Sequence, residues 1–521
     1  MYMKNKILSL LSGTVVLIIV MLSSIYTIFR NGNNCVVDTA VLSLLILSLF
    51  HARKKMNVIY SDIFGRASIS ALTTIASYFA AIYFLKINIT TRDINISILL
   101  FILSGFFGVL FFDSISKQFM DENKYIFPQQ KPRITILKEI DSNDDTHIFS
   151  FSMIFSALLS SLFRIFHLFP SSIKVNDNFS IDPSIVTLSS GYFIGMKNIL
   201  ILLIGTLYSL VILFVFHSAS YSEHLQNPYI YSLIIGFSLS QGIETLFEYF
   251  SSKEFFKFND GIKTLKNAST FILLFIMILI YMIVFSGLLS EELYIPWWIF
   301  LLVIPFSTIL SISTINGIAE TGYWVSVIDD LLPLLIVILF SNVNLLSVII
   351  CISGLSIFEV TGIYYIINRR VGNEFQMNRS SVKKISFCSI LVGIVVGIVI
   401  VLFFCNLSTF LSSELPAPLT QVFALQIKTV KDAIGNAIIP QSINLKVFFI
   451  SFVVSWILCR KNISPIIILS GIMLPYGTVL LLVIGGLLSI KKQNKIKKEK
   501  FFSGLALGDG IITAIGTFIQ K

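Results

Sequence analysis

Apolar runs of about 20 residues recur from one end of this chain to the other. A helix of that length crosses the roughly 30 Å hydrocarbon core of a bilayer. Hydrophobic residues make up 55% of the chain and charged residues only 13%, whereas about 25% of an ordinary soluble domain is charged. The runs are continuous and do not alternate with polar residues, which excludes a membrane β-barrel. The sequence therefore predicts an all-α, polytopic helical membrane protein.

The lengths of the runs predict about 14 to 16 membrane-spanning segments, including broken or re-entrant helices, within one integral membrane domain over residues 1–521. The expected segments are 7–29, 36–50, 66–86, 95–115, 147–169, 183–217, 227–248, 268–290, 295–313, 316–341, 344–367, 385–410, 418–440, 445–459, 464–490 and 502–519. The segment 183–217 is too long for one helix and is interrupted by Gly191 and Gly195. We therefore expect a half-span followed by a full span there.

Basic residues between the runs predict on which side each loop lies, because Lys and Arg are enriched on the cytoplasmic side. Lys4 and Lys6 precede the first run, and the polar connection 117–146 carries several cations, so we expect both to be cytoplasmic. The first run is too long for the apolar region of a signal peptide. The net charge of +10 fits this topology and contact with anionic lipid rather than nucleic acid. We expect a multi-pass protein of the cell membrane.

The segment 464–490 is apolar throughout but is interrupted near its middle by Pro475, Tyr476 and Gly477. Proline lacks an amide hydrogen and glycine frees the backbone, so a helix is not expected to run straight through. Cations flank both ends, which indicates that the segment enters the bilayer and returns to the same side. Broken segments of this kind mark the binding region of a secondary transporter, which makes Tyr476 a candidate. Two short spans joined by a tight turn are the alternative.

An acid inside an apolar run is costly and usually faces a bundle interior or an aqueous cavity. The strongest case is Glu320, which lies between Gly317 and Gly322 in an expected break. The glycines would let the backbone bend and offer its amides and carbonyls to a ligand. The candidate binding residues of this passage are Asn316, Glu320, Thr321 and Tyr323. The alternative is a loop between two spans in which Glu320 is simply solvated.

Asp509 is a second candidate, because it lies inside the apolar run 502–519 with small residues on both sides. The alternative is an acid that stabilises the start of a helix. Packing or boundary positions are expected for the other acids within or beside apolar runs, which are Asp38, Glu244, Asp329, Asp330 and Glu359.

Signatures of catalysis and of metal binding are missing. The sequence contains no P-loop, no G-x-S-x-G elbow, no H-E-x-x-H pair and no C-x-x-C cluster. The five cysteines and five histidines are scattered without ligand spacing, and apolar packing is expected for the cysteines. We therefore expect no enzymatic activity, no metal site and no cofactor.

Several short motifs occur in an order that resembles the oligopeptide transporter family, which includes the yellow-stripe-like metal-chelate carriers. The motifs are DENKYIFPQQ at 121–130, the region 181–195, LPAPLTQ at 415–421, the P…GIMLP…IGGL segment at 465–487, and GLALGDGI at 504–511. Asp509 stands where the family more often has Glu. Glu320 and Thr321 only loosely match the family's G-x-T-D-x-x-P segment.

This resemblance implies a secondary active transporter, a proton-coupled symporter that imports oligopeptides or metal chelates by alternating access. Its partners would be a peptide or metal-chelate substrate, the coupling proton and membrane lipid, with assembly into a homo-oligomer left open. The expected binding or coupling residues are Asn316, Glu320, Thr321, Tyr323, Gln421, Tyr476 and Asp509. A lipid-linked saccharide flippase and a non-transporting membrane subunit of a larger complex are alternatives. A flippase should carry cations inside its spans, and here the apolar runs contain few.

Overall fold

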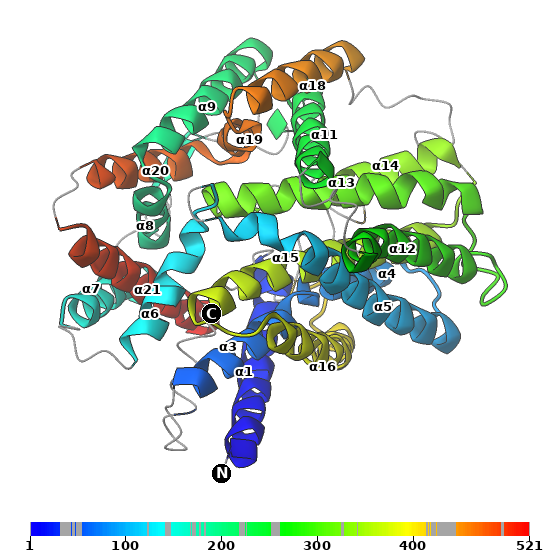
Figure 1. Cartoon of the computed structure of the whole chain (residues 1–521), viewed down its shortest axis with the longest axis horizontal. Coiled ribbons are helices and arrows are strands. Elements are labelled where there is room, and N and C mark those ends of the chain that lie inside the picture. The colour runs from blue at the N-terminus through cyan, green and yellow to red at the C-terminus, as the bar shows by residue number, and fades with distance from the viewer. Residues whose placement is uncertain are drawn as a thin grey trace.

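Helices make up nearly all of the part of the chain that the computed structural model describes (Figure 1). The described residues are 2–31, 43, 47, 55–121, 124–140, 147–166, 168, 173–176, 179–181, 184–217, 224–225, 227–251, 261–324, 328–340, 342–412, 415, 417, 424, 444–490 and 494–519. The α-helices are α1 (Tyr2–Asn31), α3 (Lys55–Ile69), α4 (Leu72–Leu85), α5 (Thr91–Ile115), α6 (Lys131–Glu139), α7 (His147–Arg164), α8 (Ile185–Ile194), α9 (Met196–Phe216), α11 (Pro228–Ser251), α12 (Gly261–Val284), α13 (Trp297–Thr321), α14 (Ile328–Leu339), α15 (Leu345–Glu374), α16 (Arg379–Cys405), α18 (Leu445–Arg460), α19 (Pro465–Met473), α20 (Tyr476–Ser489) and α21 (Lys495–Ile519). The part of the chain that the structure describes also contains two short 3-10 helices, η1 (Ser116–Met120) and η2 (Pro128–Gln130), and one small hairpin, β1 (Ile173–Asn176) with β2 (Phe179–Ile181).

Eight helical stretches in the described part are long and apolar enough to cross a membrane. Shorter apolar helices cover Leu11–Tyr26, Ile185–Ile194, Thr270–Val284 and Tyr476–Ser489. The all-α polytopic membrane fold is thereby confirmed. The expected total of about 14 to 16 segments stays a prediction.

The passage from Asn316 to Glu320 differs from the expected broken segment, because α13 continues through it to Thr321. A glycine inside a helix lowers helix stability only modestly, and the apolar residues of α13 are packed on both sides of Gly317. The break comes instead at Gly322, whose φ of 81° caps the helix in the left-handed region. Glycine adopts this conformation without the steric cost of a Cβ.

Several helices begin before the expected spans. α3 starts at Lys55 and α21 at Lys495, ahead of the predicted segments 66–86 and 502–519. Lysine has a high helix propensity, so a basic turn readily extends an apolar helix beyond its apolar part. The expected segments 36–50 and 418–440 lie almost entirely outside the described residues.

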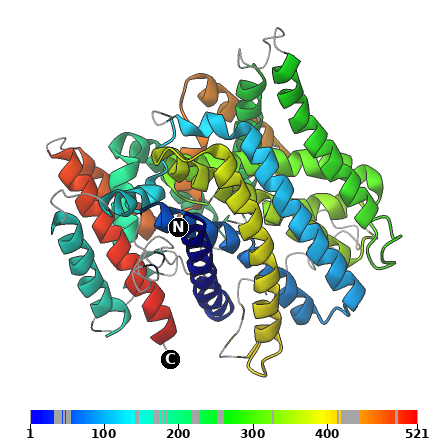
Figure 2. The ribbon, with the colours of Figure 1, turned by 60° about the horizontal axis from the view of Figure 1, so that its bottom comes forward.

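The centre of the molecule is α15, whose residues are nearly all buried inside the protein. It packs against α5 and α16, which run near each other in Figure 2. The peripheral helices α7 and α9 expose apolar side chains such as Phe155 and Phe214, as lipid-facing helices do.

Two groups of four helices form an internal repeat with an approximate two-fold relation. The first group is α7, α8, α9 and α11, and the second is α18, α19, α20 and α21. They pack in reverse order, as the pairs α7 with α21, α8 with α20, α9 with α19, and α11 with α18. Figures 1 and 2 both show α7 and α21 side by side at one edge of the molecule. Exchanging the two groups leaves this set of pairs unchanged, as a two-fold axis requires.

Glycine contacts fix the register of the repeat. In each of four contacts, a Cβ added to the glycine would lie 1.9 to 2.3 Å from a backbone carbonyl oxygen of the partner helix. The glycines and the residues that carry these oxygens are Gly191 with Leu482, Gly471 with Leu202, Gly205 with Ile468, and Gly485 with Leu188. Gly471 and Leu482 follow Gly191 and Leu202 at one constant offset along the chain. The same offset separates Gly485 from Gly205 and Ile468 from Leu188. Backbones approach this closely only where a residue has no side chain.

The offset also aligns the sequences. It pairs identical residues at Ser184 and Ser464, Ser190 and Ser470, Gly191 and Gly471, Leu200 and Leu480, Leu202 and Leu482, Ile204 and Ile484, and Gly205 and Gly485. The helix break at Gly195 then corresponds to the break at Pro475. Both breaks were predicted from the sequence, and both are confirmed.

The outer helices of the repeat correspond as well. A Cβ on Gly504 of α21 would meet Ser152 and Phe149 of α7, and a Cβ on Gly236 of α11 would meet Ser451 and Phe448 of α18. Aligning the outer helices by these two contacts also brings two hydrogen bonds into correspondence. The Ser160 hydroxyl donates to Asp509, and the thiol of Cys459 donates to the Gln241 side-chain oxygen. Gln241 is therefore the repeat counterpart of Asp509.

Candidate functional site

Glu320 lies in the last turn of α13 and is only 7% exposed. Its Oε2 atom is buried and accepts no hydrogen bond of normal geometry from the described residues. The side chains whose charge or polarity acts on it come from three directions: Ser464 at the start of α19, Lys124, and Glu248 of α11. A buried carboxylate oxygen without a partner is costly, so this position needs an explanation.

The other buried acids of the described part all have partners. They are Asp62, Asp93, Asp113, Glu244, Glu359 and Asp509. Glu320 is thus the exception among the buried acids that the structure describes.

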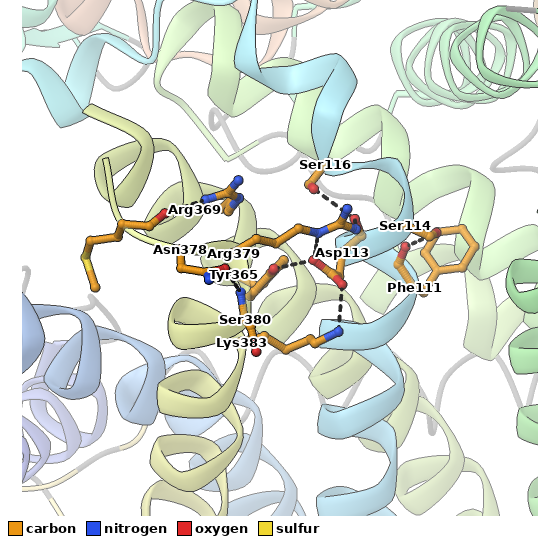
Figure 3. A network of polar contacts seen from close by, with 11 residues as sticks. Phe111, Asp113, Ser114, Ser116, Tyr365, Arg369, Asn378, Arg379, Ser380 and Lys383 are labelled. Carbon is orange, nitrogen blue, oxygen red and sulfur yellow. Dashed lines mark hydrogen bonds and ion pairs between the residues drawn. The ribbon is translucent and has the colours of Figure 1, made fainter. Parts of the chain in front are cut away.

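Asp113 of α5 is a saturated acid, by which we mean a carboxylate whose two oxygens both have hydrogen-bond or ion-pair partners (Figure 3). Its Oδ1 atom accepts hydrogen bonds from the Tyr365 hydroxyl and from Arg379 Nε, the latter at 2.7 Å. Lys383 donates to Oδ2 at 3.1 Å from the opposite side. The group joins α5, α15 and the start of α16, and a structural role accounts for it.

Asp62 is a second saturated acid, and it is fully buried with Arg133 of α6. Arg133 Nε donates to Asp62 Oδ2 at 2.6 Å, and Arg133 Nη2 donates to Asn368 Oδ1 at 3.1 Å. The pair attaches the connection 117–146 to the helices, so part of this expected polar loop is folded into the protein.

Asp509 is 1% exposed and lies in the middle of α21. Oδ1 accepts a hydrogen bond from the Ser160 hydroxyl at 2.6 Å, and Oδ2 accepts one from the Val186 amide at 2.9 Å. Ser184, the N-cap of α8, lies 3.5 Å from Oδ2, and Arg164 Nε lies 3.8 Å from Oδ1. The carboxylate therefore occupies the N-terminus of half-helix α8, where a negative charge is favourable.

Asn316 lies one turn before Glu320, and its side chain is fully satisfied. Its Oδ1 atom accepts a hydrogen bond from the Tyr125 hydroxyl at 3.0 Å, and Nδ2 donates to Thr245 Oγ1 at 2.9 Å. These bonds connect α13 with α11 and with the segment 124–130. Burial first, and then the negative charge of Glu320, raise the pKa of the Tyr125 phenol well above its ordinary value.

The segment 124–130 covers the end of α13. The Phe127 amide donates to the Ala319 carbonyl at 2.8 Å, and a Cβ on Gly322 would lie 2.8 Å from the Gln129 side chain. Lys124 forms an ion pair with Glu248 at 2.7 Å, and both side chains are about half exposed. The two sequence motifs around Pro128 and Glu320 are thus one structural unit.

Thr321 and Tyr323 lie where the two broken helix pairs meet. The hydroxyls of Thr321 and Ser470 are 3.3 Å apart, which brings the end of α13 against α19. The Tyr323 side chain lies beside Thr187 of α8 and packs against a buried apolar cluster to which α8, α9, α19 and α20 contribute. The structure therefore brings these two candidates together with the broken segments.

Tyr476 begins α20, directly after the break at Pro475. Its hydroxyl lies 3.1 Å from Ser209 Oγ and 3.3 Å from His224 Nε2, and the latter two atoms are 2.8 Å apart. Thr206 adds a hydrogen bond to the Gly471 carbonyl at 3.0 Å. Hydroxyls of α9 thus bind the carbonyls of α19 and the Tyr476 phenol at the break. Burial lowers the pKa of His224.

Sequence reasoning missed Thr206, Ser209, His224 and Ser464. Single hydroxyls in an apolar run carry no signal of their own, but the constant offset between 184–205 and 464–485 would have identified Ser464.

Gln421 lies outside the described residues. No hydrogen bond or ion pair joins Glu320 to Asp509 within the described part, and no three His, Cys, Asp or Glu side chains there are grouped to hold a metal ion.

Comparison with known proteins agrees with this architecture. The sequence profile of a family described as OPT oligopeptide transporter protein matches residues 229–520, which is more than half of the chain and includes nearly all of α11 and the helices from α12 to α21. No curated protein matches the chain significantly. The chain belongs to the OPT oligopeptide transporter family.

Proposed function

We propose that this transporter is a proton-coupled symporter of short peptides that works by alternating access in the cell membrane, with its N-terminus in the cytoplasm. The observation that carries the proposal is the unpartnered Oε2 of Glu320 in a buried position. An acid inside a helical bundle that is not neutralised by a fixed partner can gain and lose a proton as its surroundings change.

The surroundings of Glu320 suit such a change. The end of α13 touches both broken helix pairs through Thr321 and Tyr323, and transporters place their substrate at breaks of this kind. The segment 124–130 closes over it and is held on its outer side by an exposed ion pair, which is weak and easily broken. Asn316, Thr321, Tyr323 and Tyr476 line or support this junction, whereas Asp509 binds the start of α8.

Uptake by proteoliposomes tests the proposal. Vesicles with an imposed pH gradient, acidic outside, should accumulate labelled short peptides, and vesicles without a gradient should not. Glu320→Gln should abolish the gradient dependence, while Glu374→Gln, which removes an ion-paired acid at the end of α15, should leave it intact.

Gradient-driven uptake that survives in Glu320→Gln would remove Glu320 from the coupling role. Accumulation of a labelled metal chelate but not of peptides would change the substrate class and leave the coupling role standing.

A further inference from the structure

The two half-helices α8 and α19 are equivalent in the repeat, but their first turns have different partners. Each is preceded by a serine at the N-cap, Ser184 and Ser464. At α8 the free backbone amides face a carboxylate, because Asp509 accepts the Val186 amide hydrogen at 2.9 Å. At α19 the residue in the position of Asp509 is the neutral Gln241, whose oxygen accepts from Cys459 at 3.3 Å.

Within the described residues, the repeat therefore supplies no carboxylate to the start of α19 as it does to the start of α8. The Ser464 side chain makes no cap hydrogen bond, and its buried Oγ atom has no partner of normal geometry among the described residues. Glu320 reaches the same place from a different helix, and its Oε2 atom is also without a partner. The Ser464 hydroxyl and the Glu320 carboxyl group, which could satisfy each other, therefore lie side by side without a hydrogen bond of normal geometry between them.

The remaining charged and titratable groups that face Glu320 do not settle its charge. Lys124 favours the carboxylate, and Glu248 opposes it. Those two side chains neutralise each other in an exposed ion pair. Tyr125 and Cys459 also lie near Glu320. The start of α19 is a suitable partner for a negative charge here, since a helix N-terminus attracts anions.

We propose that the deprotonated Glu320 carboxylate docks on the N-terminus of α19, with the Ser464 hydroxyl as its positioning donor, as Asp509 does permanently on α8. This inference rests on the proposed function, because it describes how the coupling proton changes the structure. Protonation releases Glu320 from α19, and deprotonation pulls the end of α13 onto it. The neighbouring contact of Thr321 with Ser470 transmits this movement to the broken segment.

Infrared difference titration of the purified protein tests the inference without a transported substrate. The carbonyl stretch of a protonated buried acid that disappears in Glu320→Gln reports the protonation midpoint of Glu320. Ser464→Ala should raise this midpoint by about one pH unit, because a hydrogen bond to the charged form is lost. The matched control is Ser184→Ala in the other half of the repeat, which should leave it unchanged.

A second variant covers the case in which Ser464→Ala does not fold. Gln241→Asp places a fixed carboxylate where the repeat puts Asp509, so it should compete for the start of α19 and raise the Glu320 midpoint further than Ser464→Ala does. A Glu320 signal that titrates with the same midpoint in both variants would overturn the docking and leave the proposed function intact. The absence of any Glu320-dependent signal between about pH 4 and pH 9 would overturn both.

Discussion

Asp509 and Glu320 are both buried acids beside the N-terminus of a half-helix. Asp509 is saturated, whereas Glu320 is open, by which we mean that one of its oxygens has no partner of normal geometry. Asp509 belongs to the second group of the repeat and accepts hydrogen bonds from Ser160 and Val186 of the first group. Glu320 comes from α13, which lies outside the repeat, and leaves one oxygen unbonded. The difference separates two uses of a buried acid. A saturated acid holds helices in place, whereas an open acid can change its charge.

The most direct way to sharpen this comparison is to break a saturated acid completely. Arg133→Leu leaves the fully buried Asp62 without its cation. Removing one partner of a buried ion pair typically costs about 3 to 5 kcal/mol. We expect a large fall in the melting temperature in detergent, measured by intrinsic fluorescence. A melting temperature within error of the wild type would show that the pair does not attach α6 to the core.

Asp509→Ala should have the next largest effect. It leaves the Val186 amide and the Ser160 hydroxyl without their acceptor, which costs about 2 to 3 kcal/mol. The loss of stability should be accompanied by faster hydrogen exchange at the first amides of α8, followed by mass spectrometry. Unchanged exchange there would show that Asp509 does not hold this helix.

Glu320→Gln should behave in the opposite way. The substitution removes a charge that has no fixed partner, so the melting temperature should stay the same or rise slightly. A fall comparable with that of Asp509→Ala would erase the distinction between an open and a saturated acid. The same fluorescence assay decides between the two results.

Lys124→Ala should have the smallest effect on stability. Its ion pair with Glu248 is about half exposed, and such pairs contribute about 0 to 1 kcal/mol. We expect nearly unchanged melting but faster labelling of a cysteine placed at Gln129 by a water-soluble thiol reagent, because segment 124–130 opens more often. Equal labelling rates would mean that this ion pair does not hold the segment closed.

The sequence was sufficient for the membrane class and for both helix breaks, because Gly195 and Pro475 interrupt long apolar runs. It did not reveal that α13 continues through Gly317, because helix packing stabilises a glycine that local propensity disfavours. It also did not distinguish Glu320 from Asp509. That distinction depends on which amides and hydroxyls surround each acid, and these come from distant segments such as those around Val186 and Ser464.

The internal repeat was hidden for a similar reason. Its identical residues are few and separated, and most are Gly, Ser or Leu, which are common in any membrane helix. Contacts such as Gly191 with Leu482 and Gly471 with Leu202 make the relation evident, because they show the same offset in space and in sequence.

Proton exchange on substrate binding tests the central claim most directly. A pH-indicator dye in weakly buffered detergent solution measures protons taken up or released when a transported peptide is added to the purified protein. We expect a proton exchange in the wild type and in Asp509→Asn, and none in Glu320→Gln. An equal proton exchange in Glu320→Gln would contradict it.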